Sequence, residues 1–238
     1  MEKRRSCFDG YANGDELVQR YHDEEWGVPC RDEQKLIEFF ILELFQAGLS
    51  WKTILHKREA FRAALDGFDV EKIAAYGPEK VEELMGNPAI IRNRRKIEGM
   101  IVNAGIVLEI RKEYGSFTEY LWHFTDGKTI PEPIDVTADD LSDDVSKDMK
   151  KRGMKFAGSV TVFSFLQSVG IIYSHPEYCW RYKADHAERF AGNKFESPAD
   201  AGLSNCSIGA EAPAAAIGKT ASADFASARN KFESPADA

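Results

Sequence analysis

The sequence predicts an all-α fold for residues 1–183, and three observations support this fold class. Apolar residues recur in that stretch with the spacing of amphipathic helices. The strict alternation of apolar and polar residues that indicates strands is nearly absent, and Gly, Pro and Asn separate the periodic segments at short distances. A helical body with short connections follows from these patterns.

The expected helices follow one another along this body. Ordinary start and stop signals bound them, such as Asp32 before one helix, Gly77-Pro78 before another and Asn87-Pro88 after it. We expect helices over about residues 14–24, 32–46, 50–64, 70–76, 78–86, 93–113, 116–123, 138–151 and 157–169. The only extended stretch, 128–136, contains Pro131 and Pro133, so we predict a loop there.

Residues 184–238 differ from this body in composition. They are rich in Ala, Ser and Gly, and the nonapeptide Asn-Lys-Phe-Glu-Ser-Pro-Ala-Asp-Ala occurs at 193–201 and again at 230–238. So few large apolar side chains cannot offset the conformational entropy that ordering would remove. We therefore expect two parts, a helical domain at 1–183 and a disordered tail at 184–238.

The composition restricts the kinds of function. The net charge of the 238 residues is -8, which argues against a nonspecific nucleic-acid coat but leaves room for a local basic face. No run of about eighteen apolar residues occurs, and the charged start leads into polar sequence, so we expect no membrane association and a cytoplasmic location. The widely spaced cysteines fit a reducing compartment. The sequence shows no additional apolar stripe for a dimer, so we expect a monomer.

One carboxylate stands inside an apolar helical run. At roughly 100° per residue, Glu43 falls over Phe40 and Ala47, on the face that should be buried. A buried acid needs a salt bridge, a proton, a metal, or a ligand that offers charge or donors. Aromatic residues in neighbouring segments, among them Trp26 and Trp51, could form a slot for a flat, electron-poor or cationic ring. A structural ion pair and plain core packing are the alternatives.

A basic turn joins the helices expected at 78–86 and 93–113. Free backbone amides at the start of the second helix, with the basic side chains around them, would suit a phosphate of a nucleic-acid backbone. The basic side chains are Arg92, Arg94, Arg95 and Lys96. A solvated basic face is the alternative.

The end of the helical body contains half of a possible metal site. His175 and Cys179 have the three-residue gap found at tetrahedral zinc sites. Cys7 and His22 would complete a closed shell, but they stand about 150 residues away and spacing alone cannot select them. Isolated buried cysteines and surface histidines are the alternative.

Four segments together resemble the 3-methyladenine DNA glycosylase I family, and the similarity runs in order from about residue 5 to 180. The segments are Tyr21-His22-Asp23-Glu24-Glu25-Trp26-Gly27-Val28-Pro29, Leu42-Glu43 with Gln46-Ala47-Gly48-Leu49-Ser50-Trp51, Ile90-Ile91-Arg92-Asn93-Arg94, and Ser146-Lys147-Asp148-Met149-Lys150-Lys151-Arg152-Gly153-Met154-Lys155-Phe156-Ala157-Gly158. The resemblance implies a helix-hairpin-helix DNA glycosylase fold with one structural Zn2+ that joins the N- and C-terminal segments. It also implies a monofunctional enzyme that flips 3-methyladenine out of double-stranded DNA and hydrolyses its N-glycosidic bond, leaving an abasic site.

Matching positions imply roles for individual residues. The zinc ligands fall on Cys7, His22, His175 and Cys179. The base pocket falls on Glu43 and Tyr21 as the catalytic pair, with Trp51, Trp26, Phe8 and Ser164 as substrate-binding residues. The DNA-binding residues that we expect are Gly48, Leu49, Ile91, Arg92, Arg94 and Lys96. Ala89 departs from the family's pattern, which usually has Gly at that point of the hairpin.

The implied chemistry gives the buried acid a purpose. Methylation at ring nitrogen three makes the adenine cationic, so the base leaves as a neutral molecule without being protonated. The enzyme must extrude the nucleotide, stack the base on Trp51, bind it through Glu43 and Tyr21, and admit water. Leu49 is a candidate apolar wedge for the gap in the duplex, with core packing as its alternative.

The sequence is compatible with two functions of other classes. The chain could be a noncatalytic binder of alkylated or damaged DNA that has the same pocket. It could also be a hydrolase whose zinc does the chemistry, which requires an open coordination position.

Overall fold

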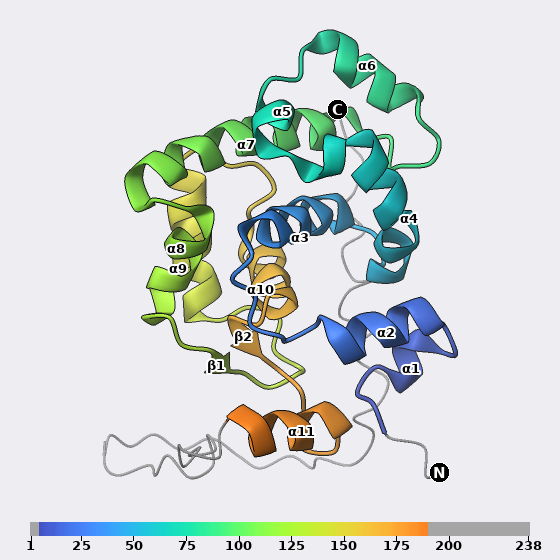
Figure 1. The fold of residues 1–238 in the computed structure, drawn as a ribbon, viewed down its shortest axis with the longest axis vertical. Helices are drawn as coiled ribbons and strands as arrows, with labels where there is room; N and C mark the ends of the chain where they lie inside the picture. Colours follow the sequence, from blue (N-terminus) through green and yellow to red (C-terminus); the bar gives the residue numbers. More distant parts are fainter. Residues whose placement is uncertain (1–4, 190–238) are drawn as a thin grey trace, which may run out of the picture.

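The computed structural model describes residues 5–189, and most of them are helical (Figure 1). The helices are α1 (Asp9–Ala12), α2 (Glu16–Glu24), α3 (Glu33–Gln46), α4 (Trp51–Ala64), α5 (Val70–Ala74), α6 (Pro78–Gly86), α7 (Arg94–Tyr114), α8 (Phe117–Trp122), α9 (Asp140–Lys151), α10 (Ser159–Ser168) and α11 (Trp180–Arg189). Two short 3-10 helices, η1 (Asp66–Phe68) and η2 (His123–Thr125), follow α4 and α8. Each helix expected from the sequence overlaps one of these, whereas α1 and α11 are additional.

Side-chain caps explain where most of the helices begin. In each case the carboxylate, hydroxyl or amide oxygen of the residue before the helix accepts a hydrogen bond from a backbone N–H of the first turn. The capping residues are Asp15, Asp32, Ser50, Asp69, Asn93, Ser116 and Asp139.

A pair of two-residue strands interrupts the helical pattern. Strand β1 (Ile130–Pro131) pairs in parallel with β2 (Ile172–Tyr173), so that Ile130 lies opposite Ile172 and Pro131 opposite Tyr173. The stretch predicted as a loop, 128–136, is therefore a loop except for β1. Proline is tolerated there because a two-stranded pair consists only of edges.

Helix α3 occupies the centre of the body, with α10 packed against it and α4, α7 and α8 around it (Figure 1). Every residue from Leu36 to Gln46 is buried, and the ring of Phe40 contacts those of Phe117 and Phe165. A helix that is apolar on all sides is stable only when neighbours cover all of its faces. Glu43 is thus in the interior of the protein, as the sequence predicts.

The C-terminal end of the described chain extends further than composition suggested. Helix α11 crosses the boundary expected at residue 183, and Asp185, 2% exposed, accepts a hydrogen bond of 2.9 Å from the hydroxyl of Tyr173. Arg181 forms an ion pair with the same carboxylate. The tail from 190 onward, including both copies of the nonapeptide, lies outside the described residues, so the predicted disorder stays a prediction.

The two ends of the described chain lie at the same end of the molecule (Figure 1). The backbone N–H of Trp180 donates to the carbonyl oxygen of Arg5 at 2.9 Å. In the part of the chain that the structure describes, no helix has both the length and the apolar character needed to cross a membrane.

Candidate functional site

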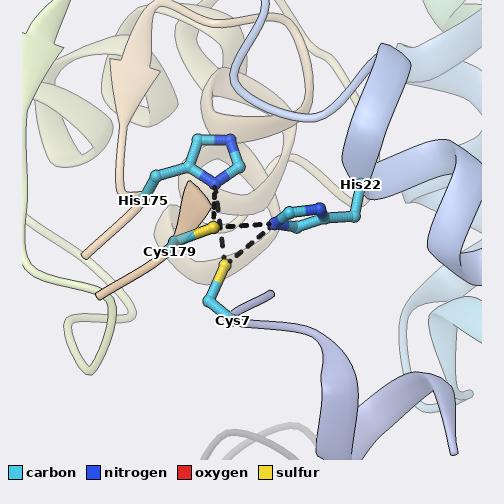
Figure 2. A group of neighbouring side chains, drawn as sticks. All are labelled: Cys7, His22, His175 and Cys179. Atoms are coloured by element: carbon cyan, nitrogen blue, oxygen red, sulfur yellow. Dashed lines mark hydrogen bonds between the residues drawn. The ribbon is translucent and has the colours of Figure 1, made fainter. Parts of the chain in front are cut away.

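Four side chains from the two ends of the chain converge on one point (Figure 2). Cys7 comes from the segment before α1, His22 from α2, and His175 and Cys179 from the segment between β2 and α11. Their candidate ligand atoms all lie within 4.8 Å of one another. Nε2 of His22 is 3.1 Å from Sγ of Cys7 and 3.3 Å from Sγ of Cys179, and Nδ1 of His175 is 3.6 Å from each sulfur. The predicted convergence of the four residues is therefore confirmed.

Neighbouring groups fix the orientation of both imidazole rings. Nδ1 of His22 lies 2.8 Å from Oδ1 of Asp23, which leaves Nε2 to face the sulfurs. Nε2 of His175 lies 3.0 Å from the carbonyl oxygen of Trp26, which leaves Nδ1 to face them. Outer hydrogen bonds of this kind set the tautomer of a metal-binding histidine and raise its basicity. The ring orientations are those of a ligand set.

The two thiols influence each other's ionisation. Burial, followed by the hydrogen bond and charge of Cys179, raises the pKa of Cys7. The hydrogen bond from Cys7, joined by those from His175 and His22, outweighs burial and lowers the pKa of Cys179. Two adjacent thiolates repel, and a divalent cation between them removes the repulsion, so the pair is suited to binding a metal ion.

The arrangement fits a closed tetrahedral metal site. Bonds of about 2.3 Å to sulfur and about 2.0 Å to nitrogen, at tetrahedral angles, put sulfur and nitrogen ligands about 3.5 Å apart. The separations of 3.1 to 3.6 Å in the cluster agree with that value. Two sulfurs and two nitrogens would fill all four positions of such a shell.

A wall of aromatic rings connects this cluster to the interior. Phe8 contacts His22 and Trp26, with centroid distances of 4.9 and 4.8 Å, and Trp26 contacts His175 at 4.6 Å. All of these side chains are buried. The Cys and His cluster therefore supports the same rings that the family resemblance assigns to the base pocket.

The buried acid and the aromatic residues expected to line its pocket come from three packed helices. Glu43 of α3 is 1% exposed. The ring of Tyr21, on α2, meets that of Trp51, the first residue of α4, at 5.3 Å and an interplanar angle of 51°. Helix α4 packs against both α2 and α3. Nε1 of Trp51 is a buried donor that has no hydrogen-bond partner among the described residues, which is expected where a ligand supplies the acceptor.

Ser164 lies on α10, a helix that packs against α3, and it is partly exposed. Its assignment to the pocket stays a prediction.

The basic turn between α6 and α7 is only partly as expected. Arg92 and Arg95 are exposed and form no ion pair among the described residues, whereas Arg94 pairs with Glu82 at 2.8 Å. Ile91 packs against the core and is partly buried. Free basic side chains beside the start of α7 suit an anion, and Arg92 and Arg95 fulfil that condition best.

Lys96, which we expect to contact DNA, is buried in this structure. Its side chain is 6% exposed, and Nζ donates to the carbonyl oxygens of Phe45 at 2.9 Å and Ala47 at 2.5 Å. Burial lowers the pKa of Lys96. A long alkyl chain allows a lysine to start on a basic surface and end at an interior acceptor, which explains why the sequence pattern misleads.

The turn between α3 and α4 has a fixed shape. Gly48 is exposed with a φ of +78°, a conformation that suits glycine, and Leu49 is partly buried against the core. The N–H of Leu49 donates to the carbonyl of Gln46, and the side-chain amide of Gln46 donates to the carbonyl of Leu49 at 2.8 Å. Both sequence-based interpretations of Leu49, core residue and wedge, fit a partly buried side chain.

Sequence reasoning missed two supporting residues. Asp23 accepts from His22 and also from Nε1 of Trp180 at 3.2 Å, and an acid next to a candidate histidine ligand was an available signal. The hydroxyl of Tyr11 accepts a hydrogen bond of 2.9 Å from the N–H of Lys52 at the start of α4. No local pattern indicates that contact, since 41 residues separate its partners.

Comparisons with known proteins agree with this site. The family model described as methyladenine glycosylase matches residues 11–182. DNA-3-methyladenine glycosylase 1 of Escherichia coli (strain K12) is 41% identical over 181 residues, which cover 73% of this chain and 95% of that protein. The DNA-3-methyladenine glycosylase of Haemophilus influenzae (strain ATCC 51907 / DSM 11121 / KW20 / Rd) is 40% identical over 164 residues, which cover 67% of this chain and 89% of that protein.

Solved structures lead to the same class. The 3-methyladenine DNA glycosylase I of Staphylococcus aureus, whose structure concerns recognition of 3-methyladenine, has a TM-score of 0.69 and 38% identity, and the match covers 73% of this chain and 96% of that one. A crystal structure of 3-methyladenine DNA glycosylase I has a TM-score of 0.67 and 42% identity, and the match covers 70% and 94%. The fold and the site together define a DNA glycosylase, an enzyme. The chain belongs to the methyladenine glycosylase family.

Proposed function

We propose that this enzyme excises 3-methyladenine from alkylated double-stranded DNA by hydrolysing the N-glycosidic bond and leaving an abasic site. The observation that carries the proposal is the burial of the Glu43 carboxylate in α3. Helix α4 packs against α3 and α2, and these two neighbouring helices carry the rings of Trp51 and Tyr21. The relatives named as 3-methyladenine DNA glycosylases support the choice of base.

The chemistry needs an anionic pocket more than an acid catalyst. The methylated base is a cation that leaves as a neutral molecule, so the pocket must bind a flat positive ring. The Trp51 ring offers a stacking surface, the carboxylate of Glu43 offers the opposite charge, and the hydroxyl of Tyr21 offers a hydrogen bond. A buried carboxylate gives up its hydration on folding, so a cationic ligand is attracted more strongly than in water.

We also propose that the Cys2His2 cluster binds one structural Zn2+. Cys7, His22, His175 and Cys179 would hold it, and zinc there would supply a cross-link between the chain's two ends. The donor set, the separations between ligand atoms and the oriented imidazoles support this choice. A catalytic zinc keeps an open position, and a shell of four protein ligands has none, so hydrolysis at the metal is the weaker alternative.

Binding of duplex DNA fits the segment from α6 to α7, which we propose is a helix-hairpin-helix element. The exposed Arg92 and Arg95, with the backbone amides at the start of α7, support phosphate binding. We propose a monomeric, cytoplasmic enzyme, and Cys7, Cys30 and Cys179, which form no disulfide among the described residues, are compatible with a reducing compartment.

Release of free base from methylated duplex DNA tests the proposal. Purified protein should release 3-methyladenine, measured by chromatography. Glu43→Gln removes the charge opposite the cation and should slow release by about 30-fold or more. Trp51→Ala removes the stacking surface and should slow it by about tenfold. Glu59→Gln, an exposed glutamate on α4 that pairs with Arg62, is the control and should leave release unchanged.

The rival function gives a different result in the same preparation. A noncatalytic binder would retain lesion-containing duplex in a binding assay and release no base. That outcome would contradict the proposed function while leaving the pocket in place.

A further inference from the structure

Lys96 connects the start of α7 to the end of α3, two segments that lie far apart in the sequence. It is in the first turn of α7, next to the exposed Arg95, and its side chain runs inward to the C-terminal end of α3. There Nζ bonds the carbonyl oxygens of Phe45 and Ala47, which have no partner within the helix because α3 stops at Gln46. A lysine at this position satisfies those acceptors and opposes the negative end of the helix dipole.

A second lysine makes the reciprocal contact. Lys57, on α4, donates from Nζ to the carbonyl oxygen of Ala89 at 2.9 Å, and its distance to the carbonyl of Pro88 is 3.4 Å. One lysine thus reaches from the basic turn to the end of α3, and the other reaches from α4 to the basic turn. The Gly48–Leu49 turn lies between α3 and α4, so both of its flanks are bonded to the segment at 87–96.

Stability accounts for only part of this arrangement. Gly48, next to the bonded carbonyl of Ala47, is exposed, so water could reach that carbonyl, whereas the bond to the carbonyl of Phe45 is buried. Burying an ammonium group is costly, and burial lowers the pKa of Lys96 accordingly. An apolar side chain would fill the same space without that cost, but it would leave the buried carbonyl of Phe45 without this donor. What the lysine adds is a directional bond between the two segments.

We propose that Lys96 is a positioning residue that holds the Gly48–Leu49 turn in register with the start of α7, so that phosphate binding at α7 places Leu49 at the lesion. This inference rests on the proposed function. Contacts to DNA phosphates set the register of a protein on the duplex, and a rigid link carries that register to the turn. Without the Lys96 bonds, the two segments can shift against each other, and the wedge no longer meets the gap.

The test compares two ligands of the full-length protein. In the Lys96→Met variant, the affinity for a duplex with a tetrahydrofuran abasic-site analogue should fall about tenfold, which corresponds to about 1.4 kcal/mol. Binding of free 3-methyladenine, followed by tryptophan fluorescence, should change less than about twofold because the pocket is untouched. Lys112→Met, at an exposed lysine on the same helix, should change neither affinity. A Lys96→Met duplex affinity within twofold of wild type, or equal losses for both ligands, would overturn the proposal.

A double variant separates positioning from a general effect on DNA binding. If Lys96 acts through the turn, Leu49→Ala with Lys96→Met should bind duplex no more than about twofold more weakly than Leu49→Ala alone. Losses that multiply would overturn the proposal. If Lys96→Met does not fold, Lys57→Met breaks the reciprocal contact from a partly exposed position and must show the same selective loss of duplex affinity. Absence of base release by the wild-type enzyme would refute the proposed function instead, and the duplex affinities would still decide the role of Lys96.

Discussion

Gly27 and His175 face each other so closely that a Cβ atom on Gly27 would lie 3.0 Å from Nε2 of the imidazole. That nitrogen is the one directed at the carbonyl oxygen of Trp26, so it keeps Nδ1 turned toward the sulfurs. Gly27 also has a φ of +76°, which a residue with a side chain adopts at a cost. The glycine is therefore part of the support of the metal cluster.

Gly27→Ala should weaken metal binding. The added methyl group must displace the His175 ring, and losing an outer hydrogen bond of a ligand typically lowers metal affinity by about tenfold or more. Competition with a zinc chelator measures the affinity. Gly14→Ala is the control, since Gly14 has a φ of +82° but no atom within 4 Å of the added Cβ. Both variants carry the backbone strain, so an equal loss of affinity in both would contradict this explanation.

Leu49→Ala should weaken binding to lesion-containing duplex and leave binding of free 3-methyladenine unchanged. An apolar wedge acts only when a base has been extruded and a gap must be filled. Duplex affinity should fall by about tenfold. Gel-shift titration and fluorescence titration measure the two ligands. If Leu49 is a core residue only, both affinities should fall together and the unfolding midpoint should drop with them.

The salt dependence of DNA binding should distinguish Arg92 from Arg94. Each phosphate contact contributes about 0.9 to the slope of log K against log salt concentration, so Arg92→Ala should lower that slope by about one. Arg94→Ala should lower it less, because Glu82 already offsets the Arg94 charge at 2.8 Å. Affinities measured over a series of salt concentrations give the slopes. Equal changes for the two variants would place the phosphate contact elsewhere.

Acid should remove the stabilising contribution of Glu25. Burial raises the pKa of this carboxyl, but the hydrogen bonds and charge of Arg58 outweigh burial and lower it below 4.5. A group with a lowered pKa in the folded state stabilises above its unfolded pKa and loses that effect as pH falls through the folded value.

Glu25→Gln should therefore lower the free energy of unfolding by about 2 kcal/mol at neutral pH. Urea titrations at several pH values should show that difference shrinking as the pH falls below about 4.5. Arg58 keeps its bond to Glu38 in the variant, which limits the loss. A difference that stays constant down to pH 2 would rule out the ionised Glu25 as its source.

Periodicity was a sound guide to the helices because burial on one face leaves a trace in the local sequence. The α3 run from Leu36 to Gln46 and the caps at Asp32 and Ser50 are examples. The end of the helical body is different. The chain near Asp185 is rich in small and polar residues, and contacts such as the one with Tyr173, 12 residues earlier, show that it folds onto the body.

The residues of the site also differ in how far the local sequence reveals their role. Glu43 stands out locally because an acid in an apolar run is unusual, and its burial is confirmed. Residue spacing alone cannot identify all four members of the Cys2His2 cluster, because 168 residues separate Cys7 from His175. The family resemblance indicates which four residues belong together, and the structure confirms that they meet. The burial of Lys96 does not follow from the sequence, because its acceptor at Phe45 is 51 residues away and a basic cluster contains no sign that one member points inward.

Two contacts hold the ends of the helical body together: the hydrogen bond between Arg5 and Trp180, and the Cys2His2 cluster. The packing of the helices therefore depends little on where the chain is opened. A circular permutant whose old ends are linked and whose new ends open at an exposed turn would retain every helix contact. Such a permutant would carry the metal ligands in its middle. The cluster would then no longer join distant ends of the chain, and its contribution to stability would become that of a local cross-link.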